Sequence, residues 1–147
     1  MFAGPARRAQ IHLQRTRKTS SFTAPPTGGY SRPSTMEPSH FPLDVTVTEA
    51  RQLALAQPDR VRLLDVREPS ELEICRIPGA AAIPMGEIPD RIADLSRDQH
   101  LLVFCHHGGR SLRVAQFLRA QGFTAVSNVT GGIDAWAEQL DPQMARY

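Results

Sequence analysis

Short apolar segments that alternate with amphipathic ones constrain the fold of this chain more than any other feature. Each apolar segment is bounded by charged residues, Pro or Gly, which is typical of buried strands. We expect strands at 61–66, 81–85, 100–105 and 124–129. We expect helices behind Thr46, at 70–76, 87–95 and 111–121, and from about Ile133 onward. Because strands separated by helices form parallel sheets covered on both faces, the pattern predicts one α/β domain, a parallel β-sheet flanked by helices on both faces.

Local signals predict where two of the helices begin and end. The stretch TVTE (46–49) has the spacing of a capping box, in which Thr46 caps the helix and Glu49 bonds back to it. Pro58 cannot continue that helix. Gly122 follows the amphipathic segment 111–121 and is expected to end it in the left-handed conformation.

The charge of the chain is unevenly distributed. Residues 1–35 hold six basic residues and no acidic one, whereas 36–147 hold eleven arginines, no lysine and all fifteen acids. Residues 1–40 are rich in Pro, Ser, Thr and Gly, so we expect a disordered basic segment there and the folded domain at 41–147. The segment is a solvated tail, an organelle transit peptide or sequence upstream of a start at Met36. The acidic balance of the rest argues against nucleic acid, and no apolar stretch reaches the roughly 20 residues that a membrane span needs.

The chain has two cysteines, Cys75 and Cys105, and enough apolar residues to form a core without disulfides. Unpaired cysteines indicate a reducing compartment, and we expect a cytoplasmic protein. They also raise the question of whether one of the thiols takes part in chemistry.

Cys105 opens the most informative stretch, CHHGGRS (105–111), which we call the cysteine loop. It joins the end of an expected strand to the first turn of an expected helix, where ligands bind in open α/β sheets. Gly108 and Gly109 allow a tight turn whose N–H groups point inward, and such a ring of donors stabilises a thiolate. Arg110 adds a permanent positive charge and a fork suited to an oxyanion. These features predict a nucleophilic thiolate at Cys105.

Other interpretations of the loop compete with this one. A cysteine after an apolar strand is often inert core. Zinc is disfavoured because the adjacent Cys105, His106 and His107 cannot easily share one ion, and no second ligand cluster follows. The two histidines are better placed to shape the pocket than to act as a general base. A cysteine phosphatase or arsenate reductase is the main rival, although its loop is C-x5-R and this one is C-x4-R, a smaller ring that suits a sulfur atom better than phosphate.

Three stretches together resemble the single-domain rhodaneses, a family of sulfurtransferases. They are LLDVREPSELEICRIPGAAAIP (63–84), LLVFCHHGGRS (101–111) and NVTGGIDAWAEQL (128–140). The resemblance implies a rhodanese fold without metal or organic cofactor. It implies that Cys105 accepts sulfane sulfur as a persulfide, from thiosulfate or a protein persulfide, and passes it to an acceptor such as a thiol or cyanide.

The resemblance also implies roles for neighbouring residues. The loop residues His106, His107, Gly108, Gly109 and Arg110 would bind the substrate or persulfide, while Asp65, Arg67 and Ser111 would support the loop. Where relatives carry Gly-His before IPGA, this chain has Cys75 and Arg76, so Cys75 is either a resolving thiol for Cys105 or a partly buried helix cysteine. A non-enzymatic sulfur-carrier or interaction module is the remaining alternative.

Overall fold

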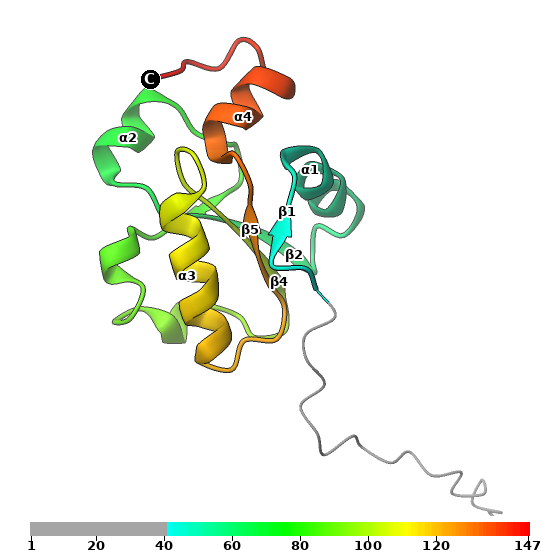
Figure 1. The fold of residues 1–147 in the computed structure, drawn as a ribbon, viewed down its shortest axis with the longest axis vertical. Coiled ribbons are helices and arrows are strands. Elements are labelled where there is room, and N and C mark those ends of the chain that lie inside the picture. Colours follow the sequence, from blue (N-terminus) through cyan, green and yellow to red (C-terminus); the bar gives the residue numbers. More distant parts are fainter. Residues whose placement is uncertain (1–40) are drawn as a thin grey trace, which may run out of the picture. The chain divides into compact units, whose positions relative to one another are not determined.

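A computed structural model describes residues 41–147 of the chain (Figure 1). The expectations for residues 1–40 lie outside the described part. The strands are β1 (Asp44–Val45), β2 (Val61–Asp65), β3 (Ala81–Ala82), β4 (His100–Phe104) and β5 (Val126–Val129). The α-helices are α1 (Val47–Ala56), α2 (Pro69–Ile74), α3 (Gly109–Ala120) and α4 (Gly132–Gln139), with 3-10 turns at Met85–Glu87 and Ile92–Asp94.

The strands form one five-stranded sheet in the order β1-β5-β4-β2-β3, in which every pairing is parallel. In Figure 1 the helix α3 and the 3-10 turns lie on one face of this sheet, and α1 and α4 lie on the other. This is the parallel α/β sheet with helices on both faces that the strand–helix alternation predicts.

The central strand β4 shows how the sheet divides the core. Its residues are all buried, and successive side chains point to opposite faces. Leu101 and Val103 pack into the cluster beneath α3, whereas Leu102 and Phe104 pack into the cluster beneath α1 and α4. Cys105 continues the first of these rows, so its side chain starts on the α3 side.

The predicted ends of two helices are confirmed. Thr46 and Glu49 form the expected capping box, with the Thr46 side chain accepting from the Glu49 amide at 3.2 Å. Gly122 has φ +91°, the left-handed conformation expected after α3. The helix α3 begins at Gly109, two residues before its predicted start, so the glycines of the cysteine loop are part of its cap and first turn.

The predicted helix at 87–95 is wrong, and the strand predicted at 81–85 is shortened to Ala81–Ala82. Two short 3-10 turns replace the helix, and Pro89, which has no N–H to bond back to Met85, ends the first of them. Ile88 nonetheless points into the core, with 1% of its surface exposed.

None of the helices in the described part of the chain is long and apolar enough to cross a membrane.

Candidate active site

The carboxyl ends of β2 and β4 bring Asp65 and Cys105 to the same edge of the sheet. In the β2–β4 register Asp65 lies opposite Phe104, and the amide of Val66 bonds to the Phe104 carbonyl at 3.0 Å. The cysteine loop therefore begins directly beside the end of β2. This is the edge at which parallel α/β sheets bind ligands.

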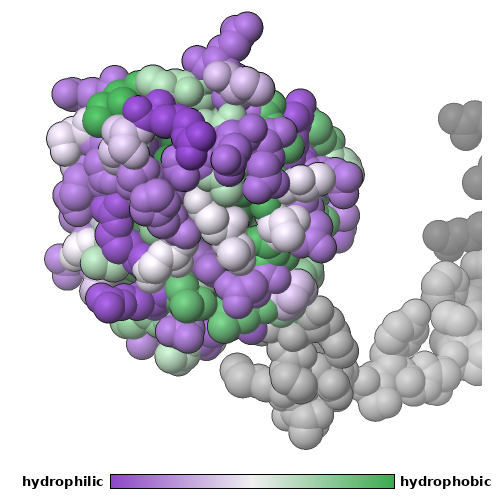
Figure 2. Space-filling model, turned by 45° about the horizontal axis from the view of Figure 1, so that its top comes forward, coloured by the Kyte–Doolittle hydropathy of each residue, from purple (hydrophilic) through white to green (hydrophobic). Residues whose placement is uncertain are grey.

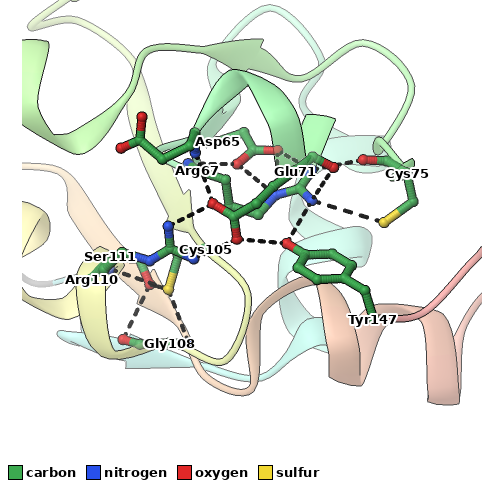
Figure 3. A network of polar contacts seen from close by, with 10 residues as sticks. Asp65, Arg67, Glu71, Cys75, Cys105, Gly108, Arg110, Ser111 and Tyr147 are labelled. Atoms are coloured by element: carbon green, nitrogen blue, oxygen red, sulfur yellow. Dashed lines mark hydrogen bonds and ion pairs between the residues drawn. The ribbon is translucent and has the colours of Figure 1, made fainter. Parts of the chain in front are cut away.

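The sulfur of Cys105 is held by three hydrogen bonds from within its own loop (Figure 3). The Gly108 amide lies 3.1 Å from Sγ, the Ser111 amide 3.4 Å and the Ser111 hydroxyl 3.3 Å. Burial alone would raise the pKa of the thiol, because only 2% of the residue is exposed. The bonds from Ser111, Gly108 and the Arg110 amide outweigh burial and hold the pKa of Cys105 below its usual value. The site therefore favours a thiolate, the nucleophilic form.

Backbone geometry explains why these amides face the sulfur. Gly108 has φ +111°, a conformation that side chains rarely adopt. The first amides of α4 hold the loop from behind, since Ile133 N bonds to the Cys105 carbonyl at 2.8 Å and Asp134 N bonds to the His106 carbonyl at 3.1 Å. With these two carbonyls turned toward α4, the amides that follow are free to turn toward the sulfur.

Gly132 makes that arrangement possible. A Cβ atom at this position would lie 2.3 Å from the Cys105 carbonyl oxygen and 2.5 Å from that of His106. These distances are shorter than van der Waals contact, and both obstacles are backbone atoms. The close approach of α4 to the cysteine loop therefore requires glycine at this position.

Ser111 links the sulfur to a buried polar chain. Its hydroxyl lies 2.6 Å from Asn128 Oδ1 and 3.2 Å from the Gly108 carbonyl, as well as near Sγ. The Asn128 amide in turn donates to Asp44 Oδ1 at 2.8 Å. Because a hydroxyl has one proton, Ser111 donates to only one of its three acceptors at a time. Asn128 therefore competes with the sulfur for that proton and positions the serine.

The guanidinium of Arg110 does not point freely into the loop. Its two terminal nitrogens each lie 2.7 Å from an oxygen of Glu71, in the parallel two-bond geometry of a strong ion pair (Figure 3). The Arg110 guanidinium lowers the pKa of Glu71 to about 2, so the carboxylate is ionised at neutral pH. The fork that the sequence suggested for an oxyanion is thus occupied by a side chain of α2.

Asp65 and Arg67 form a second, fully buried ion pair. The Nη2 of Arg67 lies 2.7 Å from Asp65 Oδ2, and Nε bonds to both carboxylate oxygens. The rest of the guanidinium bonds to the carbonyls of Glu71 and Cys75, at 3.2 and 2.8 Å. The hydrogen bonds of this pair thus hold the segment around α2, and they reach the cysteine loop indirectly, through the Glu71–Arg110 pair and through Tyr147.

Tyr147 joins this network and covers part of the loop. Its hydroxyl donates to Glu71 Oε1 at 2.8 Å and accepts from Arg67 Nη1 at 3.0 Å. Its ring stacks on His106, with centroids 4.0 Å apart. Burial is the main cause that raises the pKa of Tyr147 to about 12, so its hydroxyl remains a donor.

The two loop histidines occupy different environments. Burial lowers the pKa of His106, which is therefore neutral near pH 7. His107 is exposed, and its Nδ1 lies 3.9 Å from Asp134 Oδ2. Both rings line the outside of the cysteine loop, and within the described residues no group of three or more His, Cys, Asp or Glu side chains is placed to hold a metal ion.

Cys75 and Cys105 are both free thiols. Cys75 is half-buried at the end of α2, with Sγ 3.8 Å from Arg67 Nη1. Figure 3 places the two sulfur atoms on opposite sides of the Arg67–Glu71 network. The interpretation of Cys75 as a partly buried helix cysteine agrees with this position.

Three residues of the site were not predicted: Glu71, Asn128 and Tyr147. For Asn128 a signal was available, because a polar residue inside an apolar strand must find a buried partner. Glu71 and Tyr147 each make contact with residues that are distant from them in the chain. No spacing rule connects Glu71 with Arg110 or Tyr147.

Comparisons with known proteins find relatives of this chain in one family. The family model described as "Rhodanese-like domain" matches residues 46–139. The chain is 41% identical over 93 residues to "Rhodanese-like/PpiC domain-containing protein 12, chloroplastic" of Arabidopsis thaliana, covering 60% of this chain but only 31% of that protein. It is 36% identical over 98 residues to a "Sulfurtransferase" of Allochromatium vinosum, covering 67% and 92% of the two chains. The solved structure of a human single-domain sulfurtransferase superposes with a TM-score of 0.59 at 32% identity, covering 67% of this chain and 97% of that one.

Proposed function

Because the chain belongs to the rhodanese-like family, we propose that it is a sulfurtransferase that carries sulfane sulfur as a persulfide on Cys105. The hydrogen bonds from Gly108 and Ser111 to Sγ are the observation that carries this proposal. The same donors would stabilise the negative charge of a thiolate before transfer and of a persulfide after it.

The reaction has two steps. In the first, the Cys105 thiolate attacks the outer sulfur of a donor, the Sγ–S bond forms, and the donor's sulfur–sulfur bond breaks with its electron pair on the leaving group. Sulfite leaves if the donor is thiosulfate, and a thiolate leaves if it is a small or protein persulfide. In the second, a thiol or cyanide attacks the outer sulfur of the persulfide and restores the thiolate. Splitting one transfer into two displacements is the advantage of covalent catalysis.

The other loop residues would serve this chemistry without reacting. Gly108 and Gly109 let the loop amides approach the sulfur, Ser111 supplies a hydroxyl donor, and His106 and His107 shape the entrance. Asp65 and Arg67 would act at a distance, by holding α2 and with it the partner of Arg110. The free thiols of the chain suit a reducing compartment, so we place the protein in the cytoplasm.

The geometry gives little support to a phosphatase or arsenate reductase. Such enzymes need a free arginine to bind the oxyanion, whereas both terminal nitrogens of Arg110 are bonded to Glu71.

A sulfur-carrier role uses the same persulfide. One relative, from Bacillus subtilis, is named "Putative sulfur carrier protein YrkF" (36% identical over 93 residues, half of that protein). Enzyme and carrier then differ only in whether small acceptors remove the sulfur.

Mass spectrometry of the intact protein tests the proposal. The protein is incubated separately with thiosulfate and with a small persulfide, then with cyanide. We expect a gain of one sulfur atom on Cys105, removed by cyanide as thiocyanate. Cys105→Ala should gain nothing, and the matched variant Cys75→Ala should behave like the parent. If the parent gains no sulfur from any donor, the sulfurtransferase proposal fails, and hydrolysis of an aryl phosphate would then favour the phosphatase.

A further inference from the structure

In the described part of the chain, the two arginines beside the cysteine loop are both held in ion pairs, so neither offers a free guanidinium fork. Arg110 is matched by Glu71 through two bonds of 2.7 Å, and Arg67 is matched by Asp65. Further out, the guanidinium of Arg146 bonds to both oxygens of Asp134, at 2.9 and 3.0 Å. Each of these three cations thus faces a carboxylate of its own.

Tyr147 stabilises this neutral arrangement. Its hydroxyl bonds to Glu71 Oε1, the oxygen that also accepts from Arg110 Nη2. The Glu71 carboxylate is held further by the capping bond from the Glu68 amide to its Oε2, at 2.9 Å. Glu71 is therefore held in place by four donors, and an entering anion would have to displace the two bonds between Glu71 and Arg110 to reach that guanidinium.

Two of the loop amides are already engaged, and a neutral amide does not replace the full charge of a guanidinium. Those of Gly108 and Ser111 are already bonded to the Cys105 sulfur. A thiosulfate dianion would therefore bring its sulfonate oxygens and two negative charges to a thiolate beside which the described residues 41–147 place Arg110 and Arg67, both already paired with carboxylates. Like charges that approach within a few ångströms in a partly buried site repel strongly. Figure 2 shows that the face around this end of the molecule is mainly hydrophilic, with small, separate apolar patches.

We propose that Glu71, by occupying Arg110, makes the site selective for sulfane sulfur carried on a thiol (R–S–SH) over dianionic thiosulfate. Glu71 is thus a positioning residue that sets donor specificity through Arg110. The inference rests on the proposed function, because it concerns which donor loads Cys105.

The two loading reactions differ in charge. With a persulfide, Cys105–S⁻ attacks the outer sulfur of the protonated form R–S–SH to give Cys105–S–SH and R–S⁻. This reacting form of the donor brings no net charge into the site, and even the ionised form R–S–S⁻ brings one charge rather than two. With thiosulfate, the same attack gives Cys105–S–S⁻ and sulfite, and three negative charges share the site throughout. Only the second reaction needs a free cation, and the guanidinium of Arg110 beside the loop is already bonded to Glu71.

The test is Glu71→Gln, which keeps the shape and an acceptor oxygen but removes the charge. Loading of Cys105 is measured with thiosulfate and with the persulfide of mercaptoethanol over a series of pH values, because the Cys105 thiol must be ionised and the attacked persulfide protonated. We expect the parent to load from the persulfide far more efficiently. In the variant, KM for thiosulfate should fall about tenfold, and sulfate should become a better inhibitor by a similar factor, while KM for the persulfide stays within about twofold. The matched control is Glu87→Gln, which removes an exposed carboxylate whose partner is Arg91 and should change neither KM.

A double variant, Glu71→Gln with Arg110→Gln, keeps the inference testable if the single variant does not fold. It replaces the Glu71–Arg110 ion pair, which has no net charge, by two uncharged glutamine side chains. The KM for thiosulfate should therefore remain within about twofold of the parent value. A tenfold rise would mean that Arg110 already binds the anion in the parent, and the inference would be wrong. Efficient loading of the parent by thiosulfate would also overturn it while leaving the proposed function intact, whereas failure of every donor would overturn the proposed function.

Discussion

Replacing Gly132 by alanine tests whether the contact between α4 and the cysteine loop holds the thiolate. The new methyl group would lie 2.3 Å from the Cys105 carbonyl oxygen, 2.5 Å from the His106 oxygen and 2.7 Å from the His106 carbonyl carbon. All three are backbone atoms, so no side chain can rotate away, and either the loop or the start of α4 must move. Gly79 provides a matched control because its φ of +81° is also left-handed but a methyl group there meets nothing within 4 Å.

The two substitutions separate backbone strain from the steric clash. Placing alanine in the left-handed region costs about 1–2 kcal/mol, and this is all that Gly79→Ala should lose. Gly132→Ala, at φ +58°, pays the same strain and adds an overpacking cost of about 1–3 kcal/mol. Its movement also disturbs the bonds from Ile133 N and Asp134 N that orient the loop. We therefore expect a larger loss of stability together with a raised pKa of Cys105.

Urea unfolding measures the first effect, and titration of thiolate absorbance in the ultraviolet measures the second. Gly132→Ala should be less stable than Gly79→Ala by about 1–3 kcal/mol, and it alone should shift the thiol titration upward. If both variants lose the same free energy of unfolding and keep the same thiol pKa, the contact with α4 does not orient the loop and the reasoning is refuted.

Three further predictions concern single side chains. Ser111→Ala removes the hydroxyl 3.3 Å from Sγ and should raise the pKa of Cys105, seen as a shift of the thiolate titration to higher pH. Asp65→Asn leaves the buried charge of Arg67 unmatched and should cost about 3–5 kcal/mol in urea unfolding, and a loss below 1 kcal/mol would contradict this. Burial lowers the pKa of His100 to about 4, so the unfolded chain binds the proton more readily below about pH 6.5. Stability should therefore fall by about 3 kcal/mol from pH 6.5 to 4, and His100→Gln should flatten that slope.

Periodicity predicted the fold because the features that determine it are local or repeat along the chain. The alternation of apolar strands and helices predicted the sheet, and the capping box at Thr46 and the stop at Gly122 predicted helix ends. The segment 87–95 has the apolar spacing of a helix but folds as short 3-10 turns. Pro89 lies in the first turn of the predicted helix, where proline is tolerated, so its presence in the sequence did not exclude a helix.

The position of Cys105 was also predictable, since a strand end followed by two glycines and a helix places a thiol beside backbone amides. The hydrogen bonds from Gly108 and Ser111 arise within seven consecutive residues, so local sequence is enough to indicate them. The contribution of α4 was harder to anticipate. The positive φ of Gly132 and its approach to two loop carbonyls depend on how β5 and α4 return to the sheet edge.

The partner of Arg110 could not be read from the loop, and it changes what the loop can bind. The same residues with a free arginine would form an anion site, whereas the ion pair with Glu71, 39 residues earlier in the chain, leaves a neutral entrance. The guanidinium of the buried Asp65–Arg67 pair bonds to the carbonyls of Glu71 and Cys75, and these bonds help to hold the backbone that carries Glu71. On the proposal above, the cysteine loop holds the thiolate while charges from a distant segment of the chain decide which donor reaches it. The residues to examine for donor specificity are therefore those that contact the loop from outside. In the described structure, Glu71 contacts Arg110 and Tyr147 contacts His106.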